Sequence, residues 1–589
     1  MKSFFNFLVI AILLITALTS SAFTGSGYNF TDLTAKEKSK RIDDLISIYV
    51  EQQKFNGSIL VAENFEVVHK KGYGYANVEW NIPNSTDTKF RIASITKQFT
   101  AMLIMQLIEK GKIKLDGKIT DYLPYYRKDT GDRVTIEMLL THTSGIPSYT
   151  NKEDFFPKIS RLNFKPEEMI KEHCSDDFDF EPGTQFNYNN SGYFILGAII
   201  EEITGLTYEE ALRKNIFEPL GMINSGYDWN ESIIEKRAGA YDKTFSGFKN
   251  SPFVDMSTPY SAGALYSTVE DLFIWDKALQ TEKLLSNKWK EEFFKPRVDA
   301  LGAKYAFGWF INKKKIGDNE FDIISHDGGI NGFNTRNYFI PNKGIVVILL
   351  NNAGSAPLNE ITDKIISILN GEDIKPPLNS LVRHTHKILI EEGIEAALQQ
   401  FKYLRNEKET FAYSEREINQ LGYELLQNNK IDESLVIFKL NVEEFPKSYN
   451  TYDSYAEAWF KKGIKDSAIY YYQKSIELNP RNRGGITALK KLGVNIEEKK
   501  DAYLPEEVLR LYVGKYQLLP NFIMTVTVEG KNIYTQATGQ PRIQIFPEDE
   551  THFYVKVVDA KIEFKKENEK VTGLILYQGG QTLPAAKIE

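Results

Sequence analysis

The stretch FRIASITKQFTAML, residues 90–103, places Ser94 three residues before Lys97, where an apolar helical pattern begins. The pattern continues to Gly111, a residue type that commonly ends helices. Residues three apart lie on one face of a helix, so Lys97 can reach the Ser94 hydroxyl. The lysine acts as a base only if apolar neighbours exclude water and keep its amine neutral near pH 7. Because Ser-x-x-Lys alone is a weak signal, other stretches must decide whether Ser94 is a nucleophile.

Two further stretches supply polar groups suited to acyl transfer. FNYNNSGYFILGAIIEEITG, residues 186–205, places Tyr188 and Asn190 in a polar loop before a strongly apolar helix. ISHDGGINGF, residues 324–333, places His326 at the end of a strand, followed by glycines. Taken singly, these residues have ordinary structural explanations, as a buried tyrosine or a strand-end histidine before a turn. Their order along the chain, Ser-x-x-Lys, Tyr-x-Asn and His-x-Gly, is what makes them informative.

That order resembles the penicillin-recognising serine hydrolases of the class C β-lactamase type, which include D-aminopeptidases, D-alanyl-D-alanine carboxypeptidases and esterases. The resemblance covers about residues 36–371, where LLTHTSGIPSY, YSAGALYSTVEDLFIW and YAFGWF also look like stretches common in the group. It implies an α+β fold, an α/β sandwich of the β-lactamase/transpeptidase type. Strand-like segments at both ends of the region themselves predict one sheet assembled from both ends of a domain. Residues 324–353 predict two of these strands, around PNKG.

The resemblance implies a role for each motif residue. Ser94 is the acylating nucleophile, and Lys97 is its partner in the hydrogen-bond network. Tyr188 is the expected general base, its phenol pKa lowered by the neighbouring lysine. Asn190 is expected to bind the substrate amide or carbonyl and to hold Lys97. The reaction is therefore acyl transfer to serine followed by hydrolysis.

The strand that carries His326 is expected to bind substrate. Backbone N–H groups of Ser94 and Gly329 would form the oxyanion hole, and Gly328 belongs to the His-x-Gly motif beside it. β-Lactamases themselves usually have lysine at the His326 position, whereas histidine is only partly charged near neutrality. This departure favours an esterase or peptidase over an antibiotic-degrading enzyme. His142 in LLTHTSGIPSY is interpreted as structural, because the resemblance gives it no chemical role.

Composition and the remaining motifs exclude several other classes. The chain of 589 residues is too long for one ordinary core, so two or more domains are expected. Its net charge of −7 gives no basic excess for a phosphate backbone, and we expect no nucleic-acid partner. Absence of Gly-x-Ser-x-Gly, His-Glu-x-x-His and clustered Cys/His motifs disfavours an α/β-hydrolase or a zinc hydrolase. We expect no metal and no cofactor, and the single Cys174 excludes an intramolecular disulfide.

The N-terminus has the pattern of a secretory signal peptide, over residues 1–22. One lysine precedes an apolar run from Phe4 to Leu18, and small residues follow it up to Ala22. We therefore expect a bacterial protein that is periplasmic or secreted, and soluble after signal cleavage. An uncleaved N-terminal anchor is the alternative, although the run is short for a membrane span.

Beyond the first domain, two segments differ in character. Residues 380–495 read as helices with a period of 34 residues, which resembles tetratricopeptide repeats, and residues 387–404 are expected to form a degenerate first pair. Residues 505–589 contain short alternating segments between turn residues, typical of a small antiparallel sheet or barrel.

Two functions are compatible with these features. The first is an exported serine hydrolase acting on a small-molecule or peptide ester or amide, of the esterase or D-amino-acid peptidase type, with β-lactams left open. The second is a low-turnover penicillin-binding-like sensor whose repeats recruit a protein partner, since stacked repeats offer concave binding surfaces. The complete set of catalytic side chains favours the first.

Overall fold

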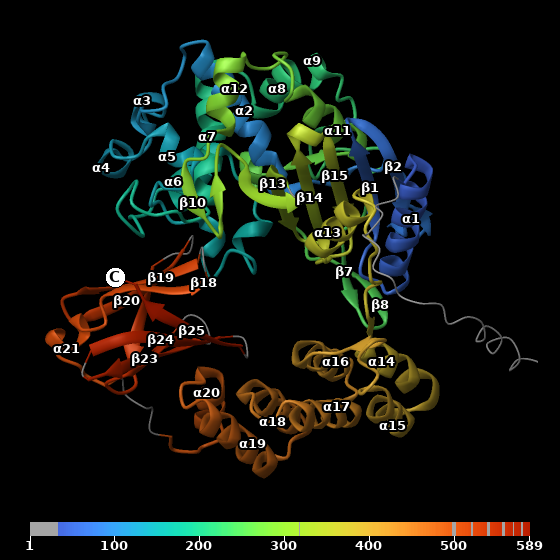
Figure 1. The fold of residues 1–589 in the computed structure, drawn as a ribbon, viewed down its shortest axis with the longest axis vertical. Coiled ribbons are helices and arrows are strands. Elements are labelled where there is room, and N and C mark those ends of the chain that lie inside the picture. Colours follow the sequence, from blue (N-terminus) through green and yellow to red (C-terminus); the bar gives the residue numbers. More distant parts are fainter. Residues whose placement is uncertain are drawn as a thin grey trace, which may run out of the picture.

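The computed structural model describes residues 33–316, 319–496, 502–519, 522–538, 542–556, 560–568, 570–578 and 581–588. The chain forms three parts: an N-terminal α+β unit, a helical segment and a C-terminal β-barrel (Figure 1). The expected signal peptide, residues 1–22, lies outside the described residues. None of the helices in the described ranges is both long and apolar enough to cross a membrane.

The α+β unit is built on an antiparallel sheet of eight strands, in the order β10-β11-β12-β13-β14-β15-β1-β2. The N-terminal β1 pairs with β15, so the sheet is assembled from both ends of the unit, as the sequence predicts. The strands are β1 (Gly57–Glu63), β2 (Glu66–Tyr73), β10 (Val298–Ala300), β11 (Ala303–Tyr305), β12 (Phe310–Ile316), β13 (Asn319–Ile330), β14 (Phe333–Ile340) and β15 (Ile345–Asn351).

The residues 324–353 form three strands, where the sequence predicts two. The chain reverses between β13 and β14 at Asn331 and Gly332, a pair that favours tight hairpins. Gly332 has a φ of +78°, and a Cβ there would lie 2.7 Å from the Ala240 Cβ.

Helices cover both faces of the sheet. On β1 and β15, alternate residues enter opposite cores, because side chains of a strand point to its two faces in turn. Leu60 and Ile348 pack towards α2 (Thr96–Glu109), α7 (Asn190–Thr204) and α11 (Val269–Ala278). Ile59 and Val347 pack towards α1 (Ala35–Glu51) and α13 (Leu358–Leu369). The two cores fix the sheet between helical layers.

Shorter elements complete the α+β unit. The helices among them are α3 (Ile119–Tyr122), α4 (Lys128–Gly131), α5 (Ile136–Leu140), α6 (Pro166–His173), α8 (Tyr208–Leu212), α9 (Glu218–Leu220), α10 (Tyr260–Gly263) and α12 (Asn287–Phe294). The strands are β3 (Tyr75–Asn77), β4 (Ile82–Pro83), β5 (Phe90–Arg91), β6 (Gly226–Tyr227), β7 (Tyr241–Thr244), β8 (Gly247–Asn250) and β9 (Leu265–Ser267). A 3₁₀ turn, η1 (Ala93–Ile95), connects β5 to α2.

The helical segment consists of antiparallel pairs. Its two central pairs begin 34 residues apart, and Gly422 lies where an added Cβ would come within 2.5 Å of the Phe438 ring. This close approach explains the glycine at position 422, and the small residue Ala456 lies at the equivalent position of the next unit. The helices are α14 (Leu381–Glu392), α15 (Ile394–Leu404), α16 (Glu415–Gln427), α17 (Ile431–Glu444), α18 (Tyr449–Lys462), α19 (Lys465–Leu478) and α20 (Arg483–Lys491); β16 (Asn379–Ser380) pairs with β17 (Phe411–Ala412) at its start.

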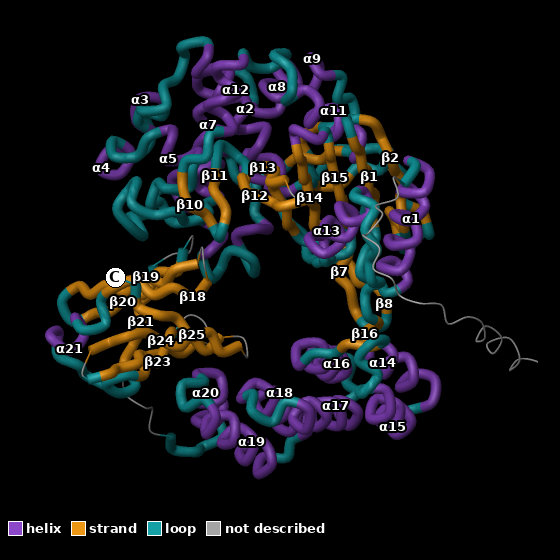
Figure 2. The backbone as a smooth tube through the Cα atoms, in the orientation of Figure 1, coloured by secondary structure: helices purple, strands orange, loops and turns teal. Residues whose placement is uncertain are grey.

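The C-terminal part is a closed antiparallel barrel, filled by aromatic and aliphatic side chains such as Tyr516, Phe553 and Phe564. Figure 2 shows this mainly strand-built part apart from the mainly helical segment before it. Its elements are α21 (Glu506–Arg510), β18 (Gly514–Leu519), β19 (Phe522–Glu529), β20 (Asn532–Ala537), β21 (Ile543–Pro547), β22 (His552–Val555), β23 (Ala560–Glu567), β24 (Lys570–Gln578) and β25 (Gln581–Lys587).

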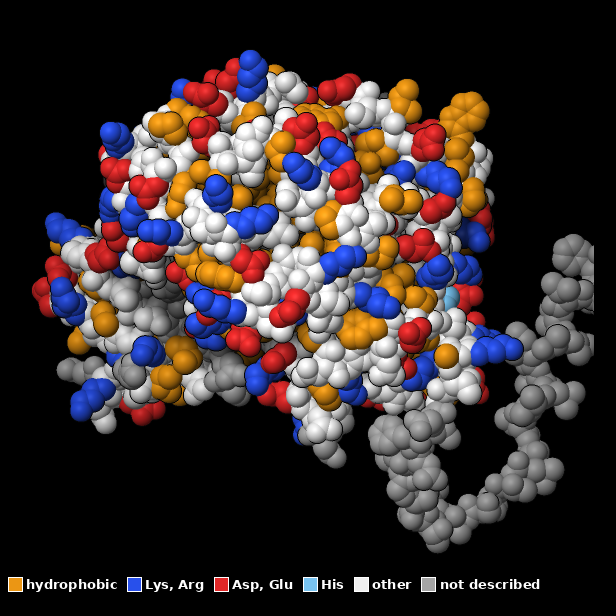
Figure 3. All heavy atoms as spheres, turned by 90° about the horizontal axis from the view of Figure 1, so that it is seen from above, with side chains coloured by type: hydrophobic (Ala, Val, Ile, Leu, Met, Phe, Trp, Pro, Cys, Tyr) orange, Lys and Arg blue, Asp and Glu red, His pale blue; other side chains and the backbone are white. Residues whose placement is uncertain are grey.

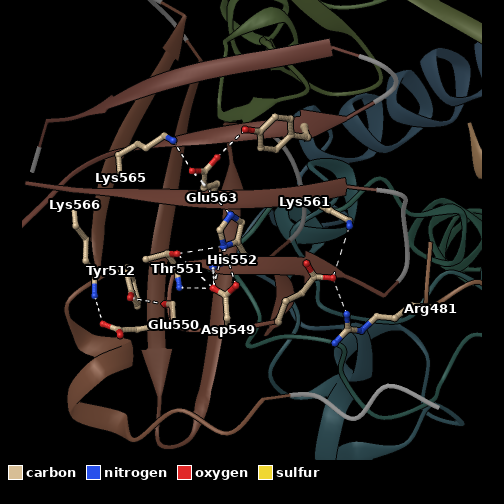
Figure 4. Close-up of polar contacts among 12 residues, drawn as sticks. Arg481, Tyr512, Asp549, Glu550, Thr551, His552, Lys561, Glu563, Lys565 and Lys566 are labelled. Carbon is tan, nitrogen blue, oxygen red and sulfur yellow. Dashed lines mark hydrogen bonds and ion pairs between the residues drawn. The ribbon is translucent and has the colours of Figure 1, made fainter. Parts of the chain in front are cut away.

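The three parts meet in turn at three places, called joints here, so that together they form a ring. The Glu424 carboxylate of α16 accepts hydrogen bonds from the backbone N–H groups of Phe245 and Ser246, between β7 and β8. Arg481, at the end of the helical segment, donates to Glu548 of the barrel at 2.7 Å (Figure 4).

The third joint brings the barrel back to the α+β unit. A cavity of about 270 Å³ is lined by Phe186, Val298 and Asp299 on one side and Gln536 of β20 on the other. Figure 1 shows the barrel lying beside β10. On the opposite end of the α+β unit, acidic and basic side chains are interspersed with apolar ones (Figure 3).

Candidate active site

Ser94 lies in the 3₁₀ turn η1, one turn before α2, so the regular helix begins at Thr96. Ala93 has a φ of +48°, a left-handed conformation that costs energy in a residue with a Cβ. Hydrogen bonds on Ile92 hold this turn: its N–H donates to the Leu265 carbonyl, and its own carbonyl accepts from Thr335. The turn is therefore fixed from both sides, with the partly buried Ser94 at its centre.

Lys97 is fully buried directly behind Ser94. Its Nζ atom lies 2.8 Å from Asn190 Oδ1, 2.8 Å from the Ala262 carbonyl oxygen and 3.1 Å from Ser94 Oγ. Burial lowers the pKa of Lys97 well below its usual value, which favours the neutral amine.

A neutral amine has two N–H groups and one lone pair, which decides what each contact of Lys97 does. The Ala262 carbonyl and Asn190 Oδ1 can only accept hydrogen bonds, so each accepts one from the two N–H groups of the amine. The lone pair is left for Ser94, whose hydroxyl can donate to it. This is the geometry of a general base.

Tyr188 lies over the same amine, with Lys97 Nζ 4.9 Å from the centre of its ring. Its hydroxyl interacts with Ser94, and lies 3.5 Å from His326 Nε2. Burial raises the pKa of Tyr188. The expectation of a phenol pKa lowered by lysine is therefore wrong, because a neutral amine does not stabilise a phenolate. Tyr188 is placed to donate a hydrogen bond, and Lys97 is placed as the base.

Asn190 is the first residue of α7, and both of its ends are held. Its backbone N–H donates to Ser148 Oγ, and its side-chain Nδ2 donates to Thr150 Oγ1, each at 3.1 Å. These contacts leave Oδ1 directed at Lys97, as expected from the motif.

His326 lies on β13, buried beside Tyr188. Its Nδ1 donates to the Asp327 carbonyl at 2.7 Å, because a carbonyl can only accept. Burial lowers the pKa of His326 to about 3. The imidazole is thus neutral near pH 7, instead of partly charged as the sequence suggests.

The two glycines after Asp327 differ in their surroundings. A Cβ on Gly328 would lie 2.2 Å from the Ile92 carbonyl oxygen and 2.3 Å from Thr335 Oγ1. A Cβ on Gly329 would have nothing within 4 Å. Gly328 therefore lets β13 approach the turn before Ser94, while Gly329 faces open space, where a substrate carbonyl could reach its backbone.

Three groups that belong to the hydrogen-bond network of the site were not identified from the sequence as its members: the Ala262 carbonyl, Tyr305 and His142. His142 Nε2 lies 3.1 Å from Tyr305 Oη, which lies 3.3 Å from His326 Nε2. All three come from stretches that look common in the group, LLTHTSGIPSY, YSAGALYSTVEDLFIW and YAFGWF, so those stretches were the available signal. Within the described residues, no group of three or more His, Cys, Asp or Glu side chains could hold a metal ion.

Comparison with known proteins adds two family matches. The model of the Beta-lactamase family matches residues 42–368, and that of a domain of unknown function (DUF3471) matches residues 498–586. The relative named PbpX from Bacillus subtilis (strain 168) is 30% identical over 347 residues, covering 58% of this chain and 83% of that protein. Penicillin-binding protein 4* from the same organism is 25% identical over 574 residues, covering 94% of this chain and 99% of that protein.

Two solved structures extend the comparison. D-amino acid amidase from Ochrobactrum anthropi SV3, in complex with L-phenylalanine amide, is 25% identical with a TM-score of 0.50, covering 56% of this chain and 98% of that chain. The octameric penicillin-binding protein homologue from Pyrococcus abyssi is 23% identical with a TM-score of 0.50. That likeness covers 92% of this chain and 99% of that chain, and it concerns the fold alone.

Proposed function

Because the chain belongs to the Beta-lactamase family, we propose that it is an exported hydrolase that cleaves an ester or amide of a D-amino acid or a similar small acyl group. The enzyme class itself is a serine hydrolase with an acyl-enzyme mechanism. The single observation that carries the proposal is the contact between Ser94 Oγ and the neutral amine of Lys97, at 3.1 Å.

The acylation step follows from the contacts. Ser94 Oγ attacks the substrate carbonyl carbon while its proton passes to Lys97 Nζ. The N–H groups of Ser94 and Gly329 stabilise the oxyanion that forms. When the carbonyl reforms, the bond to the amine or alkoxide leaving group breaks, and that group takes the proton back from Lys97. A water then repeats the sequence on the acyl-enzyme and releases the acid.

The substrate class is argued from His326. Its imidazole is neutral, so this position supplies no permanent cation for a substrate carboxylate. Amides and esters without such a carboxylate are therefore favoured over β-lactams. The likeness to D-amino acid amidase supports the same choice.

The test is intact-mass spectrometry with peptide mapping after treatment with a fluorophosphonate. We expect one adduct, on the peptide that carries Ser94, and none on Ser94→Ala. Reactive protein would then be screened against D-amino-acid amides, their L-enantiomers, simple esters and β-lactams. A folded wild-type protein without the adduct would refute the proposal.

A second function, partner binding by the helical segment, is favoured by one observation. A cavity of about 680 Å³ lies between this segment and the α+β unit, lined by basic side chains of α14 and by Phe245. The 34-residue spacing supports tetratricopeptide-like repeats, which bind peptides. The test is affinity capture with the full chain, compared with a Lys387→Glu, Ile390→Asp variant at the cavity wall. Equal capture by both would remove this candidate.

A further inference from the structure

We propose that His142 and Tyr305 are positioning residues for acylation, which orient a chain of hydrogen bonds so that the Tyr188 hydroxyl remains directed at Ser94. The inference rests on the proposed function, because it concerns the same reaction. His142, interpreted above as purely structural, has no contact with Ser94 and acts only through its neighbours.

A backbone donor at one end fixes the direction of the hydrogen bonds in this network. The Asn189 N–H donates to His142 Nδ1 at 3.0 Å. An amide nitrogen cannot accept, so Nδ1 carries no proton. Burial lowers the pKa of His142 well below its usual value, so the ring is neutral and its one proton is on Nε2. This Nε2–H donates to Tyr305 Oη at 3.1 Å.

The other end is fixed by a backbone acceptor. The His326 Nδ1–H group donates a hydrogen bond to the Asp327 carbonyl. Because the neutral ring carries only this one proton, Nε2 is an acceptor. Two hydroxyls are within reach of it, Tyr305 at 3.3 Å and Tyr188 at 3.5 Å.

Tyr305 joins the two ends. Its oxygen accepts from His142, and its O–H has two acceptors beside it, the Tyr193 hydroxyl and His326 Nε2. In the proposed arrangement this O–H donates to His326 Nε2. With that acceptor occupied, the Tyr188 O–H is left for Ser94, its other neighbour. Without the Tyr305 hydroxyl, His326 Nε2 would instead draw the Tyr188 proton away from the nucleophile.

Packing keeps the rings in place. The His142 ring lies 4.3 Å from the Tyr188 ring and 4.8 Å from the Tyr305 ring, measured between centroids. Phe310 packs on both Tyr305 and His326, at 4.8 Å and 5.4 Å. His142 also has a φ of +59°, an uncommon conformation for a histidine, which these contacts and the hydrogen bond from Asn189 maintain.

The first test compares Tyr305→Phe with Tyr227→Phe. Tyr227 is also a buried tyrosine whose hydroxyl donates one hydrogen bond, to the Met256 carbonyl at 2.8 Å, but it is not part of the chain. The readout is the rate of fluorophosphonate labelling of Ser94 as a function of reagent concentration. We expect Tyr305→Phe to lower the maximal rate about tenfold, the worth of one ordinary hydrogen bond, with little change in the half-saturating concentration. Equal rates for both variants would overturn the proposal.

The second test distinguishes positioning from packing at His142. In His142→Gln the amide N–H₂ can replace Nε2–H as donor to Tyr305. In His142→Asn the shorter side chain can replace only Nδ1, although asparagine tolerates a positive φ better. We expect the Gln variant to keep most of the labelling rate and the Asn variant to lose it. A purely structural role predicts the reverse order.

Failure of the proposed function is distinguishable from failure of this inference. If the wild-type protein is not labelled, the proposed function is wrong, and the proton positions still decide the hydrogen-bond chain. Neutron diffraction of the deuterated full chain should show hydrogen on His142 Nε2 and on His326 Nδ1. Hydrogen on His142 Nδ1 or on His326 Nε2 would overturn the inference even in a reactive enzyme.

Discussion

The Lys97 Nζ atom lies 3.1 Å from Ser94 Oγ, and the other two contacts of this amine are with groups that can only accept. This count of donors and acceptors supports Lys97 as the general base that we propose for Ser94. The same count gives the amine a structural use, since it donates to the Ala262 carbonyl and to Asn190 Oδ1 at a buried position.

Lys97→Met tests this assignment, because methionine fills a similar volume without the amine. We expect acylation of Ser94 to fall about a thousandfold, within the range of general-base contributions. Fluorophosphonate labelling, followed by mass spectrometry at matched protein concentration, measures the loss. Labelling within tenfold of wild type would assign the base elsewhere.

The pH dependence of acylation should follow the same amine. Burial lowers the pKa of Lys97, and the neutral form is reactive, so the labelling rate should fall on the acid side as one proton binds. His326, with a pKa of about 3, stays neutral there and adds no second step. Labelling rates measured across mildly acidic to neutral pH give the curve. Two proton-binding steps, or a flat profile, would contradict the assignment.

Tyr188→Phe should cost less than the loss of Lys97. A tyrosine whose pKa is raised by burial donates a hydrogen bond to Ser94 and does not take its proton. We expect labelling to slow by roughly tenfold, as for the loss of one hydrogen bond. The comparison is made with Lys97→Met at the same pH. An equal loss in both variants would restore Tyr188 as the general base.

Gly328→Ala and Gly329→Ala form a matched pair on one strand. The methyl group on Gly328 meets the Ile92 carbonyl oxygen at 2.2 Å, so β13 must move away from the turn before Ser94. The methyl group on Gly329 meets nothing within 4 Å. We expect a melting temperature lowered by several degrees only in Gly328→Ala, corresponding to about 1–3 kcal/mol. Calorimetry measures both, and equal melting temperatures would contradict the close approach of β13.

Asp276 on α11 makes the stability of the α+β unit depend on pH. It is fully buried, and burial raises its pKa from 3.8 to about 8, against one hydrogen bond from Asn337 at 2.9 Å. The folded state thus keeps a proton that the unfolded chain loses, so this stability is complete at acid pH and is lost as the pH rises towards 8. Asp276→Asn should stabilise the protein by a few kcal/mol more at about pH 8 than at about pH 5. A pH-independent difference in melting temperature would be inconsistent with a protonated Asp276.

The sequence predicts those features that short-range patterns encode. The spacing of Ser94 and Lys97 was enough to predict their contact, and the 34-residue period was enough to place helix pairs from Glu415 to Leu478. The alternating segments after residue 505 form the expected strands, although closure into a barrel depends on pairing between its first and last strands, β18 and β25. Local patterns do not encode such distant pairs.

The two errors in the predicted charge states have one physical source, the degree of burial. Tyr188 was expected to have a lowered pKa and His326 a partial charge, because both were judged by their neighbours in the motifs. Desolvation raises the pKa of Tyr188 instead of lowering it, and it removes the partial charge of His326. The degree of desolvation depends on chain segments that are far away in sequence. The contacts of His142 with Asn189 and Tyr305 likewise join stretches that are distant in sequence, so local patterns do not predict them.

Because the three parts of the chain form a closed ring, the length of the helical segment is constrained at both ends, unlike that of an open solenoid. The helical segment is anchored to the α+β unit at Glu424, and the barrel that follows it lies against the same unit at Gln536. In an open array, gaining or losing one pair only lengthens or shortens a rod. Here it would carry the barrel past its seat beside Val298 and Asp299. Closure of the ring therefore constrains the number of helix pairs in the segment, just as two fixed anchors constrain the length of a loop.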